Sequence, residues 1–379
     1  MKKKIAILGS TGSIGENTLK IIKQDKKNFE VTLLSTNKNL NRILKQAKEF
    51  KVKNILIRDL KTYQKAKFKL INSNFKIYND FNNLKKIFKK KNDFIMSSIT
   101  GLNGLEPTLK TIRFTKKILI ANKEAIICGW NLIKKIAHKI KTKIIPIDSE
   151  HSAMLQSLIG EEKEDIEEII ITASGGPFRS LSLEEMQDVS VEQALQHPNW
   201  NMGSKITIDS ATMMNKGLEI IEAHWLFDIP IEKITPIVHP ESIIHSMVTY
   251  CDGSTKAQLG PPDMKVPILY ALSYPRRLPL NSSRMDWSQK YRLHFEPVDN
   301  SRFPCIELAI DSVRMHKGGP AILNAANEIA VTQFLEGKIK YIDIPKIIER
   351  CLNKIHFSSA LNYDALVELD QQTRDYART

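Results

Sequence analysis

The first 150 residues alternate short runs of β-branched residues with longer amphipathic stretches. The short runs predict six strands, at Lys4–Leu8, Val31–Ser35, Asn54–Ile57, Phe94–Ser97, Lys117–Ile120 and Lys143–Pro146. Helical spacing of the apolar positions predicts helices at Gly15–Lys23, Asn39–Phe50, Leu105–Arg113 and Asn131–Ile140. Strands and helices that alternate in this way are typical of a doubly wound sheet of parallel strands.

The pattern changes near residue 166 and again near residue 300. Strands are predicted at Ile169–Thr172, Ile206–Ile208, Ile237–Val238, Ser246–Tyr250 and Lys256–Leu259, and helices at Met213–Leu226, Cys305–His316, Ala321–Leu335 and Ile344–Ile355. We therefore predict an α/β protein in four parts: a Rossmann-like domain (1–148), a central α/β domain (149–273), a linker (274–299) and a C-terminal helical domain (300–379).

Composition points to a globular protein of the reducing cytoplasm. The chain has 379 residues, which exceeds what one hydrophobic core supports. It contains no apolar run of the roughly 20 residues that span a bilayer, and no pattern of a secretion signal, so no membrane partner is expected. The four cysteines have no paired spacing that would indicate zinc or disulfide bonds.

Positive charge is concentrated at the start of the chain. Residues 1–143 hold 34 basic and 9 acidic side chains, a net charge of +25 in a chain whose total is +14, so the remainder is −11. Nearly all these basic residues are lysines with few aromatic neighbours for base stacking, so we expect a solvated surface and no nucleic-acid partner. Such a surface would also attract phosphorylated ligands.

Gly9–Gly15 forms a glycine-rich turn between the first predicted strand and the first helix. Glycine lets a ligand approach the backbone, and a helix N-terminus favours a pyrophosphate, so the turn predicts a dinucleotide site. A tight connection without a ligand would use the same glycines. After the second strand, Asn37, Lys38 and Asn39 stand where NAD enzymes carry a carboxylate, which favours NADP. An ordinary surface lysine would equally suit position 38.

Carboxylates follow the last strand of the first domain. Asp148 and Glu150, two residues apart on an expected extended segment, would point the same way and suit a hard divalent cation, Mg²⁺ or Mn²⁺. Glu219 could join them, because Asn215, Lys216 and Glu219 share one helix face if a helix begins near Thr212. Ser210 would then precede the first turn and complete a phosphate site. Helix capping and an exposed polar face are the alternatives for these two segments.

Three further segments offer binding groups. Ser174–Arg179 contains a second glycine turn suited to an anion, and Asn122-Lys123-Glu124 follows a strand at the same edge of the predicted sheet. Gln196–Gly203 combines Trp200 with a glycine in a polar stretch, which suits a flap (196–204) that closes over a substrate. A surface turn and a Trp packed in an ordinary interface are the alternatives.

Together these segments resemble the 1-deoxy-D-xylulose 5-phosphate reductoisomerase family. The resemblance covers Gly9–Gly15, Leu119–Glu124, Pro146–His151, Thr172–Arg179, His197–Leu226, Ile237–Met247, Leu259–Pro267 and Leu323–Ala330, in the family's order. It implies an oxidoreductase that isomerises and reduces 1-deoxy-D-xylulose 5-phosphate with NADPH and Mg²⁺, Mn²⁺ or Co²⁺, in isoprenoid precursor synthesis. It also implies a homodimer, with the central domain as the catalytic one.

The resemblance further implies roles for individual residues. NADPH would contact Thr11, Gly12, Ser13, Ile14, Asn37, Lys38, Asn39, Asn122, Glu124, Gly203 and Met264. The metal would bind Asp148, Glu150 and Glu219, which with Lys123 would be the catalytic residues. The substrate would contact Lys123, Ser149, Glu150, Ser174, His197, Trp200, Ser210, Asn215, Lys216 and Glu219.

Departures from the family pattern are few: Asn37 replaces a common Gly, Glu241 a usual Gln and Lys265 a usual Arg. Asn37 tolerates the left-handed backbone that Gly would adopt. Three other functions remain as alternatives: a metal-independent NADP dehydrogenase acting on an amino-acid semialdehyde, a basic nucleic-acid-binding protein, and a non-catalytic NADP sensor. Three convergent carboxylates and intact phosphate motifs favour the reductoisomerase.

Overall fold

The computed structural model describes residues 2–200, 202–315, 317–357 and 362–379. Asn201 of the expected flap, and His316 and residues 358–361 of the expected helical tail, lie outside the described residues. The chain forms two compact units. The first comprises Met1–Ala125, Trp130–Asp148 and Asp263–Ser282, and the second comprises Ile126–Gly129, Ser149–Pro262 and Ser283–Thr379.

This division differs in two places from the four parts expected from sequence. A unit boundary does fall after Asp148. However, residues 263–282 group with the first unit, because helix α11 (Lys265–Ser273) packs against α1 (Ser13–Gln24). The C-terminal helices group with the second sheet and do not form a unit of their own.

The first unit is built on a parallel sheet of seven strands. Its strands are β1 (Lys3–Leu8), β2 (Phe29–Thr36), β3 (Asn54–Ile57), β4 (Lys76–Tyr78), β5 (Asn92–Ser97), β6 (Thr115–Ile120) and β7 (Lys143–Pro146). Their order is β4-β3-β2-β1-β5-β6-β7, so the winding reverses between β1 and β5. Ligands of open α/β sheets bind at such a reversal, at the carboxyl ends of the strands. The predicted Rossmann-like sheet is confirmed, with β4 as an unpredicted edge strand.

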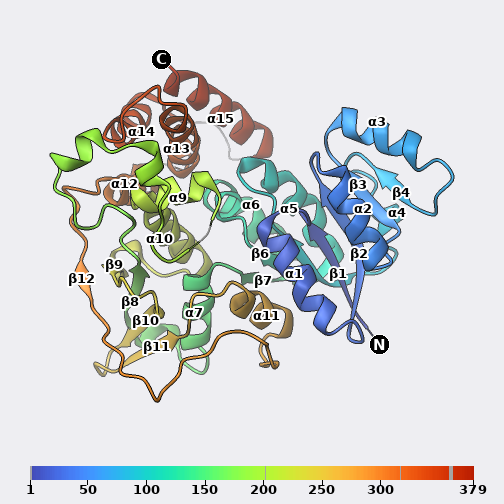
Figure 1. Ribbon diagram of the computed structural model, residues 1–379, viewed down its shortest axis with the longest axis horizontal. Coiled ribbons are helices and arrows are strands. Elements are labelled where there is room, and N and C mark those ends of the chain that lie inside the picture. Colours follow the sequence, from blue (N-terminus) through green and yellow to red (C-terminus); the bar gives the residue numbers. More distant parts are fainter. Residues whose placement is uncertain (1, 201, 316, 358–361) are drawn as a thin grey trace. The chain divides into compact units, whose positions relative to one another are not determined.

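Seven helices of the described residues connect or cover these strands. They are α1, α2 (Leu40–Glu49), α3 (Leu60–Lys69), α4 (Leu84–Ile87), α5 (Leu105–Thr111), α6 (Lys123–Ile140, of which residues 126–129 group with the second unit) and α11. Figure 1 places α3 and β4 together at the outer edge of the unit. Sequence patterning did not predict α3, β4 or α4, because this lysine-rich stretch has weak apolar periodicity.

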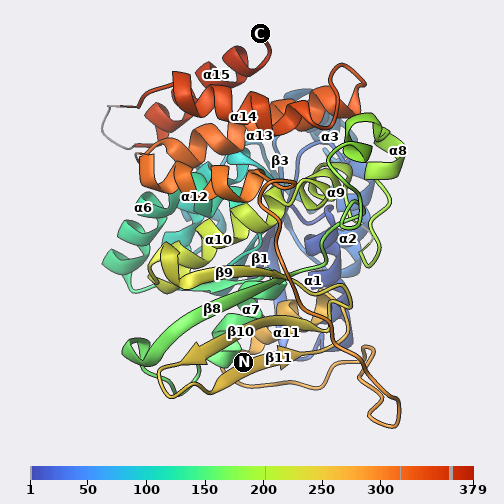
Figure 2. The same cartoon turned by 90° about the vertical axis from the view of Figure 1, so that its left-hand side faces the viewer.

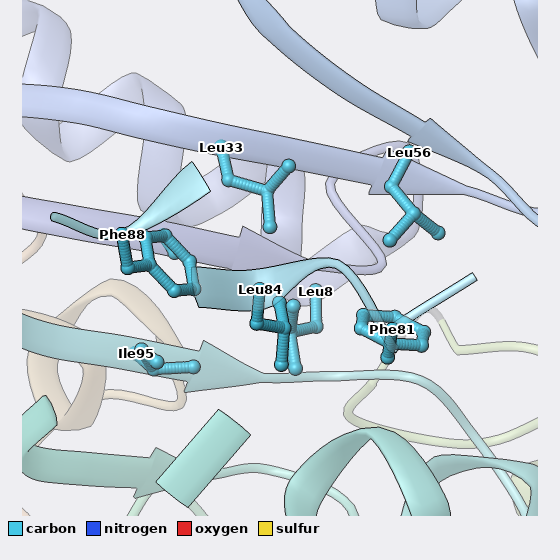
Figure 3. Close-up of a cluster of buried hydrophobic side chains, with 8 residues drawn as sticks. Leu8, Leu33, Leu56, Phe81, Leu84, Phe88 and Ile95 are labelled. Atoms are coloured by element: carbon cyan, nitrogen blue, oxygen red, sulfur yellow. The ribbon is translucent and has the colours of Figure 1, made fainter. Parts of the chain in front are cut away.

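A buried apolar cluster holds the sheet against the α4 segment. Leu8, Leu33 and Leu56 project from β1, β2 and β3, and Phe81, Leu84 and Phe88 meet them from the α4 segment (Figure 3). Each fully buried side chain of this size contributes roughly 1.5–3 kcal/mol. The cluster fixes the carboxyl end of β1, where the glycine-rich turn begins.

The second unit contains a mixed sheet of five strands. These are β8 (Ile166–Ala173), β9 (Ile234–Val238), β10 (Ile244–Tyr250), β11 (Thr255–Leu259) and β12 (Glu296–Pro297), in the order β11-β10-β8-β9-β12. Only β8 and β9 pair in parallel among these described strands. Its helices are α7 (Ser149–Ser157), α8 (Val191–Ala194), α9 (Ser204–Ala211), α10 (Met214–Phe227), α12 (Cys305–Met315), α13 (Gly319–Leu335), α14 (Asp343–Lys354) and α15 (Tyr363–Ala377).

Helices α7 and α10 pack against this sheet, and the C-terminal helices build outward from α10 (Figure 2). Helix α12 contacts α10, α13 contacts α12, and α14 and α15 contact α13. Helix α13 is buried on most sides, which explains its nearly continuous apolar sequence. No helix among the described residues is long and apolar enough to cross a membrane.

Three local predictions were wrong. Residues 206–208 form part of helix α9, because burial of Thr207, Ile208 and Ala211 outweighs the strand preference of β-branched residues. Ser210 therefore lies in the last turn of α9 and does not precede a first turn. Glu150 lies in the first turn of α7, so Asp148 and Glu150 do not share one extended segment.

Candidate active site

The glycine-rich turn lies at the reversal point of the first sheet. Gly9 has φ +81°, and a Cβ there would lie 2.6 Å from the carbonyl oxygen of Ser98, which follows β5. Gly15 is equally constrained, since its Cβ would lie 2.4 Å from the Gly9 oxygen. Helix α1 begins at Ser13, and no side chain caps it. The first amide groups of α1 remain able to bind an anionic ligand.

The end of β2 borders the same edge of the sheet. Thr36 Oγ1 lies 2.8 Å from Thr11 Oγ1, which ties this strand end to the glycine turn. Asn37 and Lys38 are exposed, and Asn39 caps α2 by accepting a hydrogen bond from Arg42 N. Asn37 does not adopt a positive φ, so its replacement of glycine costs no backbone strain.

The start of α6 brings three of the expected residues, Asn122, Lys123 and Glu124, to the carboxyl end of β6. Asn122 is buried and caps α6, accepting from Ala125 N and donating to the carbonyl oxygens of Ile99 and Gly101. Lys123 Nζ lies 2.9 Å from Asp148 Oδ2, which follows β7. Glu124 is half-buried in the first turn. Met264 lies in this unit as well, at the start of α11.

Two carboxylates of the second unit share one ammonium group. Lys216 Nζ lies 2.9 Å from Glu150 Oε1 and also contacts Glu219 Oε2. Asn215 donates to the other oxygen of Glu219 at 2.5 Å, and Ser149 Oγ donates to Glu150 Oε2 at 2.6 Å. We call Glu150, Lys216 and Glu219, with their two partners, the charged network.

Burial and neighbouring charge act in opposite directions on the pKa of Lys216. Burial alone lowers the pKa of this ammonium group, but attraction to Glu150 and Glu219 outweighs burial and raises it. Lys216 is therefore protonated at neutral pH. The charged network therefore holds two carboxylates around one positive charge. A third carboxylate, Asp148, precedes Glu150 by two residues along the chain.

A second cluster in the same unit contains only neutral groups. His197 Nε2 lies 3.2 Å from Ser174 Oγ and 3.0 Å from Ser210 Oγ. These three side chains come from the loop after β8, from the start of the flap and from the last turn of α9. Burial lowers the pKa of His197, so its imidazole is neutral at neutral pH. We call these three residues the neutral cluster.

Glycine at position 176 allows the two serines to approach each other. Gly175 and Gly176 both have positive φ, at +84° and +67°. A Cβ on Gly176 would lie 2.6 Å from the carbonyl oxygen of Ser210. The turn after β8 therefore contacts the backbone of α9 directly, which explains the pair of glycines seen in the sequence.

After His197, the described flap residues include Trp200 and Gly203. Trp200 is half-buried, and Gly203 precedes the first residue of α9, with open space where a Cβ would lie. Gly203 lies in the second unit, whereas the other residues expected to contact NADPH lie in the first.

Sequence reasoning missed two buried polar pairs that support the site. Asp209, next to Ser210, accepts a 2.8 Å hydrogen bond from Asn327 of α13 and pairs with Lys205 at 2.7 Å. His151 Nε2 lies 2.9 Å from the Glu219 carbonyl oxygen, and its Nδ1 lies 3.7 Å from Glu222 Oε2. The only sequence signal for these residues was their position beside Glu150 and Ser210.

Comparison with family models matches most of the chain. A model of 1-deoxy-D-xylulose 5-phosphate reductoisomerase matches residues 5–129, and the model of its C-terminal domain matches residues 144–227. A second C-terminal domain model, described as DXP reductoisomerase, matches residues 259–376.

Curated proteins of this name are similar along their whole length. The reductoisomerase of Clostridium tetani is 45% identical over 99% of this chain and 99% of its own. That of Bacillus subtilis is 44% identical over 100% of this chain and 99% of its own.

Solved structures of the same enzyme have the same fold. The reductoisomerase of Zymomonas mobilis in complex with NADPH has a TM-score of 0.93 at 40% identity, over 100% of this chain and 98% of its own. A DOX-P reductoisomerase in complex with NADPH, fosmidomycin and magnesium has a TM-score of 0.92 at 38% identity, over 99% and 97%. The chain belongs to the 1-deoxy-D-xylulose 5-phosphate reductoisomerase family.

Proposed function

We infer that this chain is an oxidoreductase that converts 1-deoxy-D-xylulose 5-phosphate into 2-C-methyl-D-erythritol 4-phosphate, with NADPH and a divalent cation, for isoprenoid precursor synthesis. The observation that carries this inference is the run Asp209–Glu219. It supplies Ser210 to the neutral cluster and both Lys216 and Glu219 to the charged network. One segment thus provides groups for a phosphate and for a cation, and the family relationship supports both.

For NADPH, we propose that the pyrophosphate lies against the start of α1, which no side chain caps, with Thr11, Gly12, Ser13 and Ile14 beside it. Asn37, Lys38 and Asn39 would surround the 2′-phosphate, since they offer a cation and amides and no carboxylate. The remaining contacts would come from Asn122, Glu124, Gly203 and Met264. Because the Asn122 side chain is engaged in capping α6, its contact would use the backbone.

For the divalent cation, the donor set is chemically suitable. Carboxylate oxygens of Glu150 and Glu219 lie within 4.8 Å of each other, and Lys216 places one positive charge against both carboxylates. Hard cations such as Mg²⁺, Mn²⁺ and Co²⁺ accept oxygen ligands of this kind. We propose that Asp148, Glu150 and Glu219 bind the metal. When bound, it would supply Lewis acidity towards substrate oxygens, and NADPH would supply hydride.

For the substrate, we propose that the phosphate contacts Ser174, His197, Ser210, Asn215 and Lys216. Hydroxyl, imidazole, amide and ammonium groups all donate hydrogen bonds to phosphate oxygens. The hydroxyl end would meet Lys123, Ser149, Glu150 and Glu219. Trp200 would cover the bound sugar, because an amphipathic ring can exclude water while the flap closes.

The residues of this chain would contribute to the reaction mainly by orientation and proton control. Phosphate contacts remote from the reacting carbons hold the substrate in one position through the skeletal rearrangement. Lys123, paired with Asp148 at 2.9 Å, carries protons that can hydrogen-bond a substrate hydroxyl. Exclusion of water by Trp200 limits the loss of the aldehyde before its reduction.

We propose a homodimer of the cytoplasm as the working form. The family relationship supports the dimer. The described cysteines support a reducing compartment, because none of them forms a disulfide bond. Sedimentation velocity would test the dimer, and a species of about 43 kDa at micromolar concentration would contradict it.

The decisive experiment is NADPH oxidation with 1-deoxy-D-xylulose 5-phosphate, with and without Mn²⁺ or Mg²⁺. Oxidation that requires both the sugar phosphate and the metal is the expected result. Folded protein that binds NADPH but does not oxidise it under any of these conditions would exclude the proposed reaction. Oxidation that persists in a chelator would favour a metal-independent dehydrogenase.

A further inference from the structure

His197 accepts two backbone hydrogen bonds from the residues that follow it. The amide nitrogens of Asn199 and Trp200 lie 3.1 Å and 3.0 Å from His197 Nδ1. A backbone N–H can only donate, so Nδ1 must accept and carries no proton. The proton of the neutral ring therefore lies on Nε2.

This tautomer determines how the neighbouring serines behave. Because Nε2 carries a proton, it donates to Ser174 Oγ or Ser210 Oγ and accepts from neither. Ser174 Oγ also accepts from Gly176 N at 3.3 Å. Both hydroxyl groups must then direct their own protons elsewhere. The neutral cluster offers two hydroxyl donors to an anion without using a positive charge.

The opposite tautomer would reverse this polarity. With the proton on Nδ1, Nε2 would accept a hydrogen bond from the hydroxyl group of Ser210 or Ser174. That serine would turn oxygen lone pairs towards the phosphate, which also carries only acceptors. Affinity for a phosphate would fall although every side chain remained in place.

A side chain outside the expected site holds the backbone that fixes this tautomer. Asn199 Nδ2 donates to the Pro240 carbonyl oxygen at 2.7 Å and to Ser242 Oγ at 2.8 Å. Pro240 and Ser242 lie between β9 and β10, and Ser242 has φ +51°. Both protons of the Asn199 amide are used, so the start of the flap is attached to the loop that joins β9 and β10.

We propose that Asn199 is a positioning residue that locks His197 in its Nε2–H tautomer, so that Ser174 and Ser210 donate to the substrate phosphate. The role rests on the proposed function, because the substrate's phosphate is assigned to the neutral cluster there. Asn199 itself touches neither substrate nor cofactor in this role. It acts through the amide groups at the start of the flap.

The tautomer can be measured without turnover, by NMR of protein labelled with ¹⁵N-histidine. The His197 signals are assigned from their loss in His197→Gln. We expect unprotonated Nδ1 and protonated Nε2 in the wild type near neutral pH, and a mixture of tautomers in Asn199→Ala. A wild-type ring with a proton on Nδ1, alone or on both nitrogens, would overturn the proposal regardless of activity.

The functional consequence is measured with the metal-loaded enzyme and NADPH. Asn199→Ala should raise KM for the sugar phosphate by about 10-fold or more, roughly the loss of one charge-assisted hydrogen bond, with a smaller change in kcat. Ser242→Ala removes one of the two acceptors and should give an intermediate KM. Gln187→Ala, an exposed amide that precedes the flap, is the matched control and should resemble the wild type.

Inorganic phosphate separates this proposal from the proposed function. Phosphate added to the labelled wild type should shift the His197 signals at millimolar concentrations, and Asn199→Ala should need about 10-fold more. If the sugar phosphate is not turned over but this difference appears, only the proposed function fails. If Asn199→Ala keeps the wild-type tautomer and phosphate response, Asn199 is not the positioning residue.

Discussion

The charged network and the neutral cluster differ in how they would meet an anion. The charged network places Lys216 between Glu150 and Glu219, so its hydrogen bonds join full charges in a buried setting. The neutral cluster joins Ser174, His197 and Ser210, whose polarity depends on the position of one proton. The hydrogen bonds of the charged network are strong because they join charged groups, whereas those of the neutral cluster select a ligand by the direction of their donors.

This difference suggests a division of tasks along a single substrate. Buried charges alter the energy of groups whose charge changes during reaction, so they suit the reacting end. Neutral donors bind a phosphate equally before and during reaction, so they suit the remote end. We therefore expect changes at the two carboxylates of the charged network, Glu150 and Glu219, to affect kcat most strongly. Changes in the neutral cluster, and in Lys216, whose ammonium group is assigned to the phosphate, should mainly affect KM.

Glu219→Gln should have the largest effect. It removes one buried carboxylate that faces Lys216 and the proposed metal, so kcat should fall by at least ~10²-fold. NADPH affinity, measured by fluorescence titration, should be unchanged because the cofactor residues lie elsewhere. Steady-state NADPH oxidation across a Mn²⁺ titration measures the loss. Glu164→Gln, an exposed carboxylate, is the control, and wild-type kcat in Glu219→Gln would remove Glu219 from the metal site.

Lys216→Ala should come next, with its main effect on substrate binding. The ammonium group is assigned to the phosphate, so KM should rise by roughly 10–100-fold, the equivalent of about 1.5–3 kcal/mol. The metal-free variant should also gain more thermal stability from Mn²⁺ than the wild type, because Glu150 and Glu219 lose their shared cation. An unaltered KM would argue that Lys216 serves only the two carboxylates.

Asn327→Ala tests whether the neutral cluster depends on its support. The substitution leaves buried Asp209 with Lys205 as a partner but without its amide donor. The free energy of unfolding should fall by about 1–3 kcal/mol, measured by denaturant titration. KM for the sugar phosphate should rise with it, because Ser210 follows Asp209. A loss of stability with unchanged KM would show that α13 supports the fold alone.

The smallest expected effect is on the pH dependence of stability, through His197. Burial lowers the pKa of His197 in the folded protein below the unfolded value of about 6.5. The folded state therefore binds fewer protons, so the stability that this residue contributes is present above about pH 6.5 and is lost as pH falls further. Between about pH 7.5 and 5.5 the wild type should lose more thermal stability than His197→Gln. Equal losses would mean that folding does not lower the pKa of His197.

Sequence patterning predicted the parts of this molecule in which local preference and tertiary burial agree. The strands of the first sheet are buried on both faces, so their continuous apolar runs were clear, as at Ile5–Leu8 and Ile118–Ile120. The segment 206–208 was misassigned because its β-branched residues are held in α9 by packing against α10 and α13. Local preference carries no information about such contacts.

In the candidate site, too, local sequence carries no information about which distant residues form hydrogen bonds. Sequence motifs singled out Ser174, because two glycines follow it, and His197, because a proline follows it. Ser210 was singled out by the helix that was expected to begin just after it. The bonds from Asn199 to Pro240 and Ser242 join residues about forty positions apart in two irregular segments. No periodicity relates such positions, and a hydrogen bond between loops depends on where the sheet places each of them.

Gly176 has a consequence for how far this enzyme could change its substrate. Its backbone contacts that of Ser210, so the distance between Ser174 and Ser210, the two serines proposed to bind the phosphate, is set by main chain and not by side-chain packing. Substitution there can only push the turn away from α9, because any side chain meets a carbonyl oxygen. Mutation can therefore change the part of the site that would bind the sugar more easily than the part that would bind the phosphate. We expect natural or selected variants with altered specificity to retain the phosphate and to vary the groups at its far end.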